Sequence, residues 1–147
     1  MIHSEKKKIL ITGSNGFIGK NLIINLQEEK IYKLLTFNRG DSFEELKNLI
    51  EESDIIVHLA GENRPKDSED FLKTNLNLTK EIIKFVKKYS KKSQKNIPII
   101  FSSSTQVEFE NDYGKSKLLA EKELQLFSKE EKSSVNIFRL PGVFGKW

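Results

Sequence analysis

Tyr113 and Lys117 stand four positions apart, where the sequence favours the start of a helix. Side chains at positions i and i+4 of a helix share one face, so these two would be neighbours. A tyrosine with its ordinary pKa of about 10 is a poor base at neutral pH. An ammonium group ~4 Å away favours the phenolate by about 4 kcal/mol at an effective dielectric constant of ~20, which lowers the pKa by about 3. The pair is therefore predicted to act as an acid/base catalyst near neutral pH.

A run of serines precedes this pair, in residues 101–104 (FSSS), where a predicted strand ends. A hydroxyl group at the end of a strand can orient a carbonyl group that is being reduced. Tyr-x-x-x-Lys alone is common on amphipathic helices. The catalytic interpretation therefore depends on the combination of the pair with the serines and with a cofactor site.

Three glycines with a spacing of three, Gly13, Gly16 and Gly19, follow an apolar run and precede a helical pattern. In such a unit the first glycine permits a tight turn, the second lets the backbone approach a pyrophosphate, and the third lets the helix pack closely. The helix N-terminus offers N–H groups and a positive dipole end to the anion. The alternative is a purely structural turn. A P-loop is excluded, because no Gly-Lys-Ser/Thr ends the motif.

The end of the second predicted strand indicates which dinucleotide binds. An acidic residue there would accept a hydrogen bond from a ribose 2′-hydroxyl, but this chain has Asn38 and Arg39 instead. A guanidinium group suits a 2′-phosphate through charge-assisted, forked hydrogen bonds. The sequence thus favours NADPH, with NAD less favoured, unless Arg39 is an ordinary exposed loop arginine.

The rest of the chain alternates between strand and helix patterns. Short apolar runs predict buried strands, and apolar residues repeated every three or four positions predict helices. Ser42 followed by Glu45 has the pattern of a capping box at a helix start. Residues 90–96 are polar and predict an exposed loop. The predicted strands are 8–12, 33–37, 54–60, 97–102 and 135–140, and the predicted helices are 17–28, 42–52, 69–89 and 112–128.

This alternation predicts an α/β fold of the Rossmann type, a doubly wound parallel sheet with helices on both faces. The usual strand order of that fold is 3-2-1-4-5-6. The stretch between Phe37 and Asp54 holds one helix pattern and no strand pattern, so the third strand is expected to be missing. We expect about five strands, in the order 2-1-4-5-6.

Composition limits the classes of function. With 147 residues, 37% hydrophobic, 31% charged and a net charge of +4, the chain fits one ordinary domain. Its lysine runs lack interleaved aromatic residues and arginines, so we expect a solvated surface and no nucleic acid. It has no cysteine, and its two histidines lack metal-ligand spacing, so no metal is expected. Without an apolar stretch of ~20 residues or a signal sequence, we expect no membrane contact and a cytoplasmic location.

Five segments together resemble the extended short-chain dehydrogenases/reductases, also called the NAD-dependent epimerase/dehydratase family. Within that family, VHLAGENRP (57–65) before SSSTQ and YGKSK is most similar to capsular polysaccharide reductases of the CapF type, in the UDP-N-acetyl-L-fucosamine pathway. The resemblance implies NADPH-dependent reduction of a 4-keto nucleotide sugar, with a UDP-sugar as partner, and it allows a homodimer. The segments are TGSNGFIG (12–19), DIIVHLAG (54–61), FSSSTQV (101–107), YGKSK (113–117) and RLPGVFG (139–145).

The resemblance also implies roles for individual residues. Tyr113 would be the acid/base, Lys117 the partner of the ribose and of Tyr113, and Ser104 the catalytic serine that orients the carbonyl. Ser103 is the near alternative and, with Asn63 and Arg64, is expected near the substrate, although Asn63 and Arg64 also suit an ordinary surface turn. The expected cofactor-binding residues are Gly13, Asn15, Gly16, Phe17, Ile18, Gly19, Asn38, Arg39, Leu59, Ala60, Gly61, Asn75 and Lys117.

Departures from the family keep other functions open. Gly142 stands where an asparagine is usual, and Thr105 and Gln106 replace the Asp-Glu pair of the 4,6-dehydratases, which argues against a dehydratase. Residues 1–147 would form the NAD(P)-binding domain, and the C-terminal substrate-binding part of full members would be absent. The alternatives are therefore a truncated, non-catalytic dinucleotide-binding domain, or a nucleotide-sugar epimerase of the same superfamily. Without the C-terminal part, the apolar surface that it would cover is exposed. We therefore expect modest stability or self-association.

Overall fold

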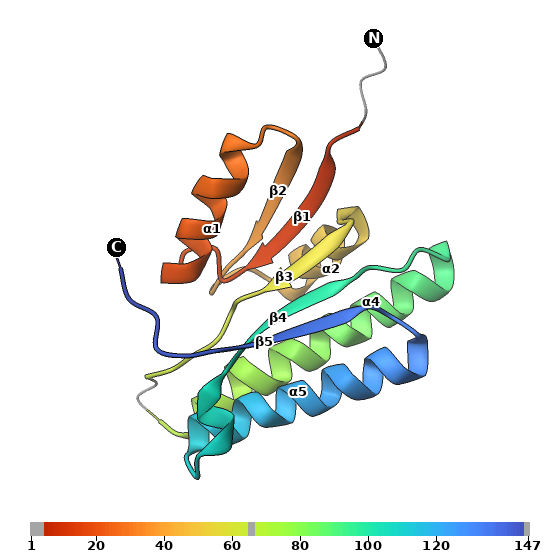
Figure 1. Cartoon of the computed structure of the whole chain (residues 1–147). Helices are drawn as coiled ribbons and strands as arrows, with labels where there is room; N and C mark the ends of the chain where they lie inside the picture. Colours follow the sequence, from red (N-terminus) through yellow and green to blue (C-terminus); the bar gives the residue numbers. More distant parts are fainter. Residues whose placement is uncertain (1–4, 65–66, 146–147) are drawn as a thin grey trace.

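A parallel sheet forms the centre of the molecule (Figure 1). The computed structural model describes residues 5–64 and 67–145, so Pro65 of the quoted motif lies outside it. Within these residues the sheet has five strands in the order β2-β1-β3-β4-β5, and every neighbouring pair is parallel. Because β3 to β5 correspond to the last three strands of the six-stranded order, the predicted order is confirmed. The strands are β1 (Lys7–Thr12), β2 (Tyr32–Phe37), β3 (Ile55–His58), β4 (Ile99–Ser104) and β5 (Val135–Leu140).

Helices cover both faces of the sheet, as predicted (Figure 1). Among the described helices, α1 packs on one face and α2, α4 and α5 pack on the other. None of the helices in the described ranges is long and apolar enough to cross a membrane. The helical segments are α1 (Phe17–Glu28), α2 (Phe43–Glu52), α3 (Glu69–Phe71), a π-helical turn η1 (Leu72–Asn77), α4 (Leu78–Ser93), a 3-10 turn η2 (Thr105–Glu108) and α5 (Asp112–Glu131).

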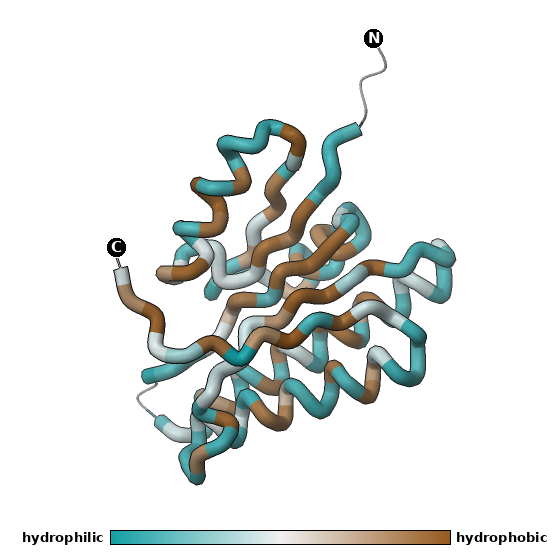
Figure 2. The backbone as a smooth tube through the Cα atoms, viewed as in Figure 1, coloured by the Kyte–Doolittle hydropathy of each residue, from teal (hydrophilic) through white to brown (hydrophobic). Residues whose placement is uncertain are grey.

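Alternation of side chains along the strands divides the core into two clusters. On β1, Leu10 is buried with the α2, α4 and α5 side, whereas Ile9 and Ile11 are buried with the α1 side. The same division separates Ile56 from Val57 on β3. The residues of β1 and β3 named above face both clusters. Figure 2 shows hydrophobic stretches along the central strands.

A local sequence signal predicted the start of α2. Ser42 caps α2, since its side chain accepts a hydrogen bond from the Glu45 N–H at 3.2 Å and the Glu45 side chain returns to the Ser42 N–H at 2.7 Å. The predicted helix 69–89 is present but contains the π-helical turn η1, which its periodicity did not reveal. The loop predicted for residues 90–96 was wrong in part, because α4 continues to Ser93 and ends at Gln94 with a φ of 57°.

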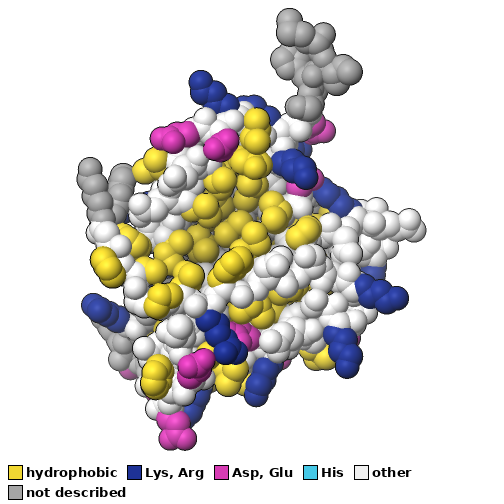
Figure 3. All heavy atoms as spheres, viewed as in Figure 1, with side chains coloured by type: hydrophobic (Ala, Val, Ile, Leu, Met, Phe, Trp, Pro, Cys, Tyr) yellow, Lys and Arg dark blue, Asp and Glu magenta, His cyan; other side chains and the backbone are white. Residues whose placement is uncertain are grey.

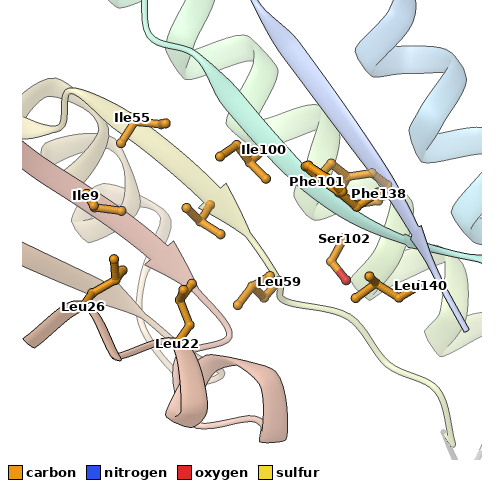
Figure 4. Close-up of a pocket in the computed structure, with 11 residues that line it drawn as sticks. Ile9, Leu22, Leu26, Ile55, Leu59, Ile100, Phe101, Ser102, Phe138 and Leu140 are labelled. Carbon is orange, nitrogen blue, oxygen red and sulfur yellow. The ribbon is translucent and has the colours of Figure 1, made fainter. Parts of the chain in front are cut away.

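One part of the sheet surface remains apolar and open beside α1. A cavity of about 340 Å³ lies there, and Figure 4 shows the residues that line it, which come from α1, from β1, β3, β4 and β5, and from Leu59 just after β3. Phe138 on β5 is 55% exposed. In Figure 3 hydrophobic side chains form a broad area across this face. The lining residues are Ile9, Leu22, Leu26, Ile55, Val57, Leu59, Ile100, Phe101, Ser102, Phe138 and Leu140.

Candidate functional site

The glycine loop joins β1 to α1 at the carboxyl edge of the sheet, and its tightness depends on two glycines. Gly13 has a φ of +72°, and a Cβ there would lie 2.7 Å from the backbone of Ala60. A Cβ on Gly19 would lie 2.7 Å from the Cα of Ser14, within the same loop. The loop is therefore pressed against the segment after β3 on one side and against α1 on the other.

The N-terminus of α1 points its backbone N–H groups into this edge. Gly16 is the N-cap residue, and within the described part of the chain no side chain caps it. The first N–H groups of a helix lack partners inside the helix and attract anions. The first turn of α1 carries no acidic residue that would compete with an anion. The local geometry thus fits a pyrophosphate, as the glycine spacing predicts.

Asn38 and Arg39, which follow β2, contact different parts of the site. The Asn38 side chain accepts a hydrogen bond from the Asn15 N–H at 3.0 Å and interacts with the Ser14 hydroxyl group, so it fastens the glycine loop. Arg39 has a side chain that is 81% exposed and pairs with Glu62. Both residues line a cavity of about 490 Å³. The other lining residues include Gly13, Asn15, Gly16, Leu59, Ala60, Gly61, Asp41, Phe43 and Lys73.

Another cavity, of about 290 Å³, contains the predicted catalytic residues and is called the second cavity of the site. Ser104 at the end of β4 and Tyr113 and Lys117 on α5 all line it, although 13 positions of sequence separate the first from the last. The two cavities share Gly13, Gly16, Leu59 and Gly61, so the glycine loop lies between them. The second cavity also contains Phe17, Ile18, Gly19, Asn63, Ser102, Ser103, Leu140, Pro141 and Val143.

Lys117 is a buried ammonium group at the floor of this cavity. Its Nζ donates a hydrogen bond to the Ser102 carbonyl oxygen at 3.0 Å and lies 4.9 Å from the centre of the Phe101 ring. A Cβ on Gly61 would lie 2.9 Å from this Nζ, so the absence of a side chain makes room for the lysine. Burial lowers the pKa of Lys117 to about 8, although the nearby charge of Glu121 opposes the decrease.

Tyr113 does not have the lowered pKa that its spacing from Lys117 predicts. Burial raises the pKa of Tyr113, and a hydrogen bond with the Ser104 side chain only partly opposes this. Removing a phenolate from water is costly, and the Lys117 ammonium is directed to the Ser102 carbonyl. The prediction that Lys117 lowers the pKa of Tyr113 toward neutral pH was therefore wrong for this structure. Tyr113 is a protonated acid here.

The two serines at the end of β4 differ in what they bind. The Ser104 hydroxyl oxygen accepts a hydrogen bond from the Gln106 N–H at 3.1 Å, and its hydroxyl group faces Tyr113, with which it interacts. The Ser103 hydroxyl donates to the carboxylate of Glu121. The geometry therefore favours Ser104 over Ser103 as the residue that orients a carbonyl group.

Glu121 connects α5 to the two strands beside it. It is 1% exposed and accepts hydrogen bonds from Ser103 and from Arg139, whose Nε and Nη2 lie 3.0 and 2.8 Å from its oxygens. Burial alone would raise the pKa of Glu121, but these partners hold it below its usual range. Ser103 and Arg139 are register partners on β4 and β5. Sequence reasoning missed this network, although Glu121 follows Lys117 at the same i+4 spacing that links Lys117 to Tyr113.

The remaining predicted residues lie in or behind the segment after β3. Asn63 lines the second cavity, whereas Arg64 lines neither cavity. Asn75, in η1, is buried behind the segment: its Oδ1 accepts from the Glu62 N–H at 2.9 Å, and its Nδ2 donates to the Glu62 carbonyl and to Ser116. Its position thus supports the segment from behind, while the segment itself faces the cavities.

Sequence and structure comparisons place these features in a family. A profile of the NAD dependent epimerase/dehydratase family matches residues 9–147. The chain belongs to this family. Its members use a nicotinamide dinucleotide, which agrees with the position of the glycine loop between the two cavities.

Two relatives are more than 30% identical to the chain, and a third protein shares its fold at lower identity. The chain is 42% identical over 140 residues to a UDP-2-acetamido-2,6-beta-L-arabino-hexul-4-ose reductase of Pseudomonas aeruginosa, covering 95% of this chain and 37% of the relative. It is 36% identical to the capsular polysaccharide assembling protein CapF of Staphylococcus aureus, with a TM-score of 0.80 and coverage of 95% and 37%. A UDP-glucuronic acid 4-epimerase of Bacillus cereus in complex with NAD, 20% identical with a TM-score of 0.80 and coverage of 94% and 57%, shares the fold. The chain thus spans about 37% of the length of its more similar relatives.

Proposed function

We propose that this family member holds NADPH and reduces the 4-keto group of a UDP-linked sugar, as part of capsular polysaccharide or O-antigen biosynthesis. One observation carries the proposal: two cavities meet at the glycine loop, with Arg39 at one and Ser104, Tyr113 and Lys117 at the other. An extended dinucleotide needs such a pair of pockets with an anion site between them. The 42% identity with a 4-ketosugar reductase supports the choice of reaction.

The chain's own groups suit each part of the cofactor. The N-terminus of α1, at Gly16, would bind the pyrophosphate, and Arg39 would bind the 2′-phosphate of NADPH. Lys117 would hold the ribose on the nicotinamide side. The bound nicotinamide would supply the hydride. Leu59, Ala60 and Gly61 would line the middle of the site.

Proton transfer would be the task of Tyr113. Since burial raises its pKa, Tyr113 carries a proton at neutral pH and can donate it to a carbonyl oxygen as that oxygen becomes an alkoxide. The Ser104 hydroxyl would orient the same oxygen by donating a hydrogen bond to it. Lys117 is positively charged below a pH of about 8, and its charge stabilises the tyrosinate that remains after donation.

The sugar nucleotide would lie beyond the second cavity, near Asn63, Arg64 and Ser103. The described part of this cavity is small, about 290 Å³, whereas the more similar relatives are much longer than the segment they share with this chain. We propose that residues 1–147 form the dinucleotide-binding domain and that the rest of the sugar pocket belongs to the part of the relatives that the chain does not match.

Two measurements on the chain test this proposal. Nicotinamide fluorescence is expected to change on titration with the protein, and NADPH is expected to be consumed when a UDP-4-keto sugar is added to the chain joined to the sugar-binding part of its relatives. Tyr113→Phe removes the proton donor and should abolish turnover while leaving NADPH binding within about twofold. Binding without turnover would indicate a non-catalytic dinucleotide-binding domain. Conversion of a UDP-sugar to its epimer without net NADPH consumption would indicate an epimerase.

A further inference from the structure

Glu62 has an unusually well-fixed carboxylate for a residue in a loop. Its Oε1 accepts hydrogen bonds from the backbone N–H groups of Asn63 and Arg64, both at 3.1 Å. Its own backbone N–H and carbonyl group are bound by the side chain of Asn75. The Glu62 side chain is 19% exposed. The carboxylate therefore cannot turn away freely when another anion approaches.

This fixed carboxylate is paired with the residue proposed to bind the 2′-phosphate. The Nη2 of Arg39 donates a hydrogen bond to the Oε2 of Glu62. Arg39 follows β2 and Glu62 follows β3, so the pair joins two loops. Arg39 lines the larger cavity, of about 490 Å³, and so does Gly61 directly before Glu62. The Arg39 interaction is the main reason that the pKa of Glu62 lies below its usual range. At neutral pH the carboxylate is thus fully charged.

We propose that Glu62 sets the choice between the two nicotinamide dinucleotides, by competing with a 2′-phosphate for Arg39 and by accepting a hydrogen bond from a 2′-hydroxyl. This inference rests on the proposed function, since it assigns the ribose of the cofactor to the larger cavity. It predicts that the unaltered protein binds both NADPH and NADH, with a preference for NADPH weaker than Arg39 alone would give.

Two physical effects of Glu62 both shift binding from NADPH toward NADH. A guanidinium group has five N–H donors, so Arg39 can meet a phosphate while it stays paired with Glu62, but the phosphate then lies close to a fixed negative charge. A ribose with a free 2′-hydroxyl carries no such charge and can donate its proton to the carboxylate, as in sites that have an acidic residue near the ribose. Lys73 and Asp41 also line this cavity, and their opposite charges partly offset each other.

The decisive experiment measures the Kd values of NADPH and NADH at constant ionic strength. The variants are Glu62→Gln, Arg39→Gln and the double variant. Glu44→Gln removes the same charge from an exposed position on α2 that does not line the cavity, and serves as the matched control. The probes 2′,5′-ADP and 5′-ADP repeat the comparison without the nicotinamide.

Glu62→Gln is expected to tighten NADPH and weaken NADH, shifting the ratio of the two Kd values by about 1.5-fold to fivefold, the range of an exposed ion pair. Glu44→Gln should leave the ratio unchanged, and the effect of Glu62→Gln should shrink when Arg39 is already glutamine. Weaker NADPH binding by Glu62→Gln would overturn the inference, because Glu62 would then position Arg39 for the phosphate. An unchanged ratio would overturn it as well. If the unaltered protein bound neither dinucleotide, the proposed function itself would fail.

Discussion

Replacing Lys117 by methionine is expected to change how the stability of the protein depends on pH. Burial lowers the pKa of this lysine from its ordinary 10.5 to about 8. Between these two values the unfolded chain holds the proton and the folded chain releases it. Since stability rises with pH wherever the unfolded state binds more protons, Lys117 makes the folded protein more stable as the pH increases. Methionine has no proton to lose and removes this contribution.

The size of the effect follows from the two pKa values. Relative to a permanently charged lysine, the contribution is well under 1 kcal/mol at pH 7, about 1 kcal/mol at pH 9 and about 3 kcal/mol at pH 10. The burial of Lys117, which is 4% exposed, justifies using the full difference. The free energy of unfolding of the unaltered protein, minus that of Lys117→Met, should therefore rise by about 2–3 kcal/mol between pH 7 and pH 10.

Urea denaturation at several pH values measures this difference. Lys115→Met is the matched control, because Lys115 lies on the same helix and is exposed. Its difference from the unaltered protein should stay constant within about 0.5 kcal/mol across the same pH range. If Lys117→Met behaved like the control, Lys117 would be hydrated in the folded protein and the burial argument would be refuted.

Three further predictions concern the glycine loop, the buried carboxylate and the open sheet face. Gly13→Ala should lower the free energy of unfolding by more than about 2 kcal/mol in urea denaturation, because of its positive φ and the nearby Ala60 backbone. Gly142→Ala, whose Cβ would meet no described atom within 4 Å, should change it by less than about 0.5 kcal/mol. Equal effects of the two would contradict the loop geometry. Glu121→Ala should cost about 1–3 kcal/mol in the same assay, since it leaves the buried Ser103 hydroxyl without its acceptor. A cost below about 1 kcal/mol would mean that the network is weak. Phe138→Ser should reduce concentration-dependent self-association in light scattering while Tm stays within a few degrees. An unaltered protein that is monomeric at every concentration would count against an interacting apolar face.

Features set by neighbouring residues could be predicted from the sequence. The tight turn at Gly13 and the capping box of Ser42 and Glu45 depend on residues within a few positions of each other. The strand order followed from the alternation of strand and helix patterns and from the lack of a strand pattern between Phe37 and Asp54. Periodicity and turn chemistry contain this information, so the carboxyl edge of the sheet was a predictable place for the site.

Features that depend on distant pairs could not be predicted in this way. Glu121 meets Arg139 only because the register of β4 and β5 places Ser103 opposite Arg139. Arg39 meets Glu62 across 23 positions of sequence. The pKa of Tyr113 rises because of burial, which the spacing of Tyr113 and Lys117 does not encode. The charges of the site are thus decided by tertiary packing, and the residue types alone gave the wrong sign for Tyr113.

A crystal structure of the chain with NADPH is the most direct test of the proposed cofactor site. We predict the pyrophosphate at the N-terminus of α1, the 2′-phosphate beside Arg39, and the nicotinamide in the cavity of Ser104, Tyr113 and Lys117. A cofactor bound in the opposite direction, with the nicotinamide beside Arg39, would contradict the proposed reaction. A dinucleotide bound away from the glycine loop would contradict the proposed site altogether.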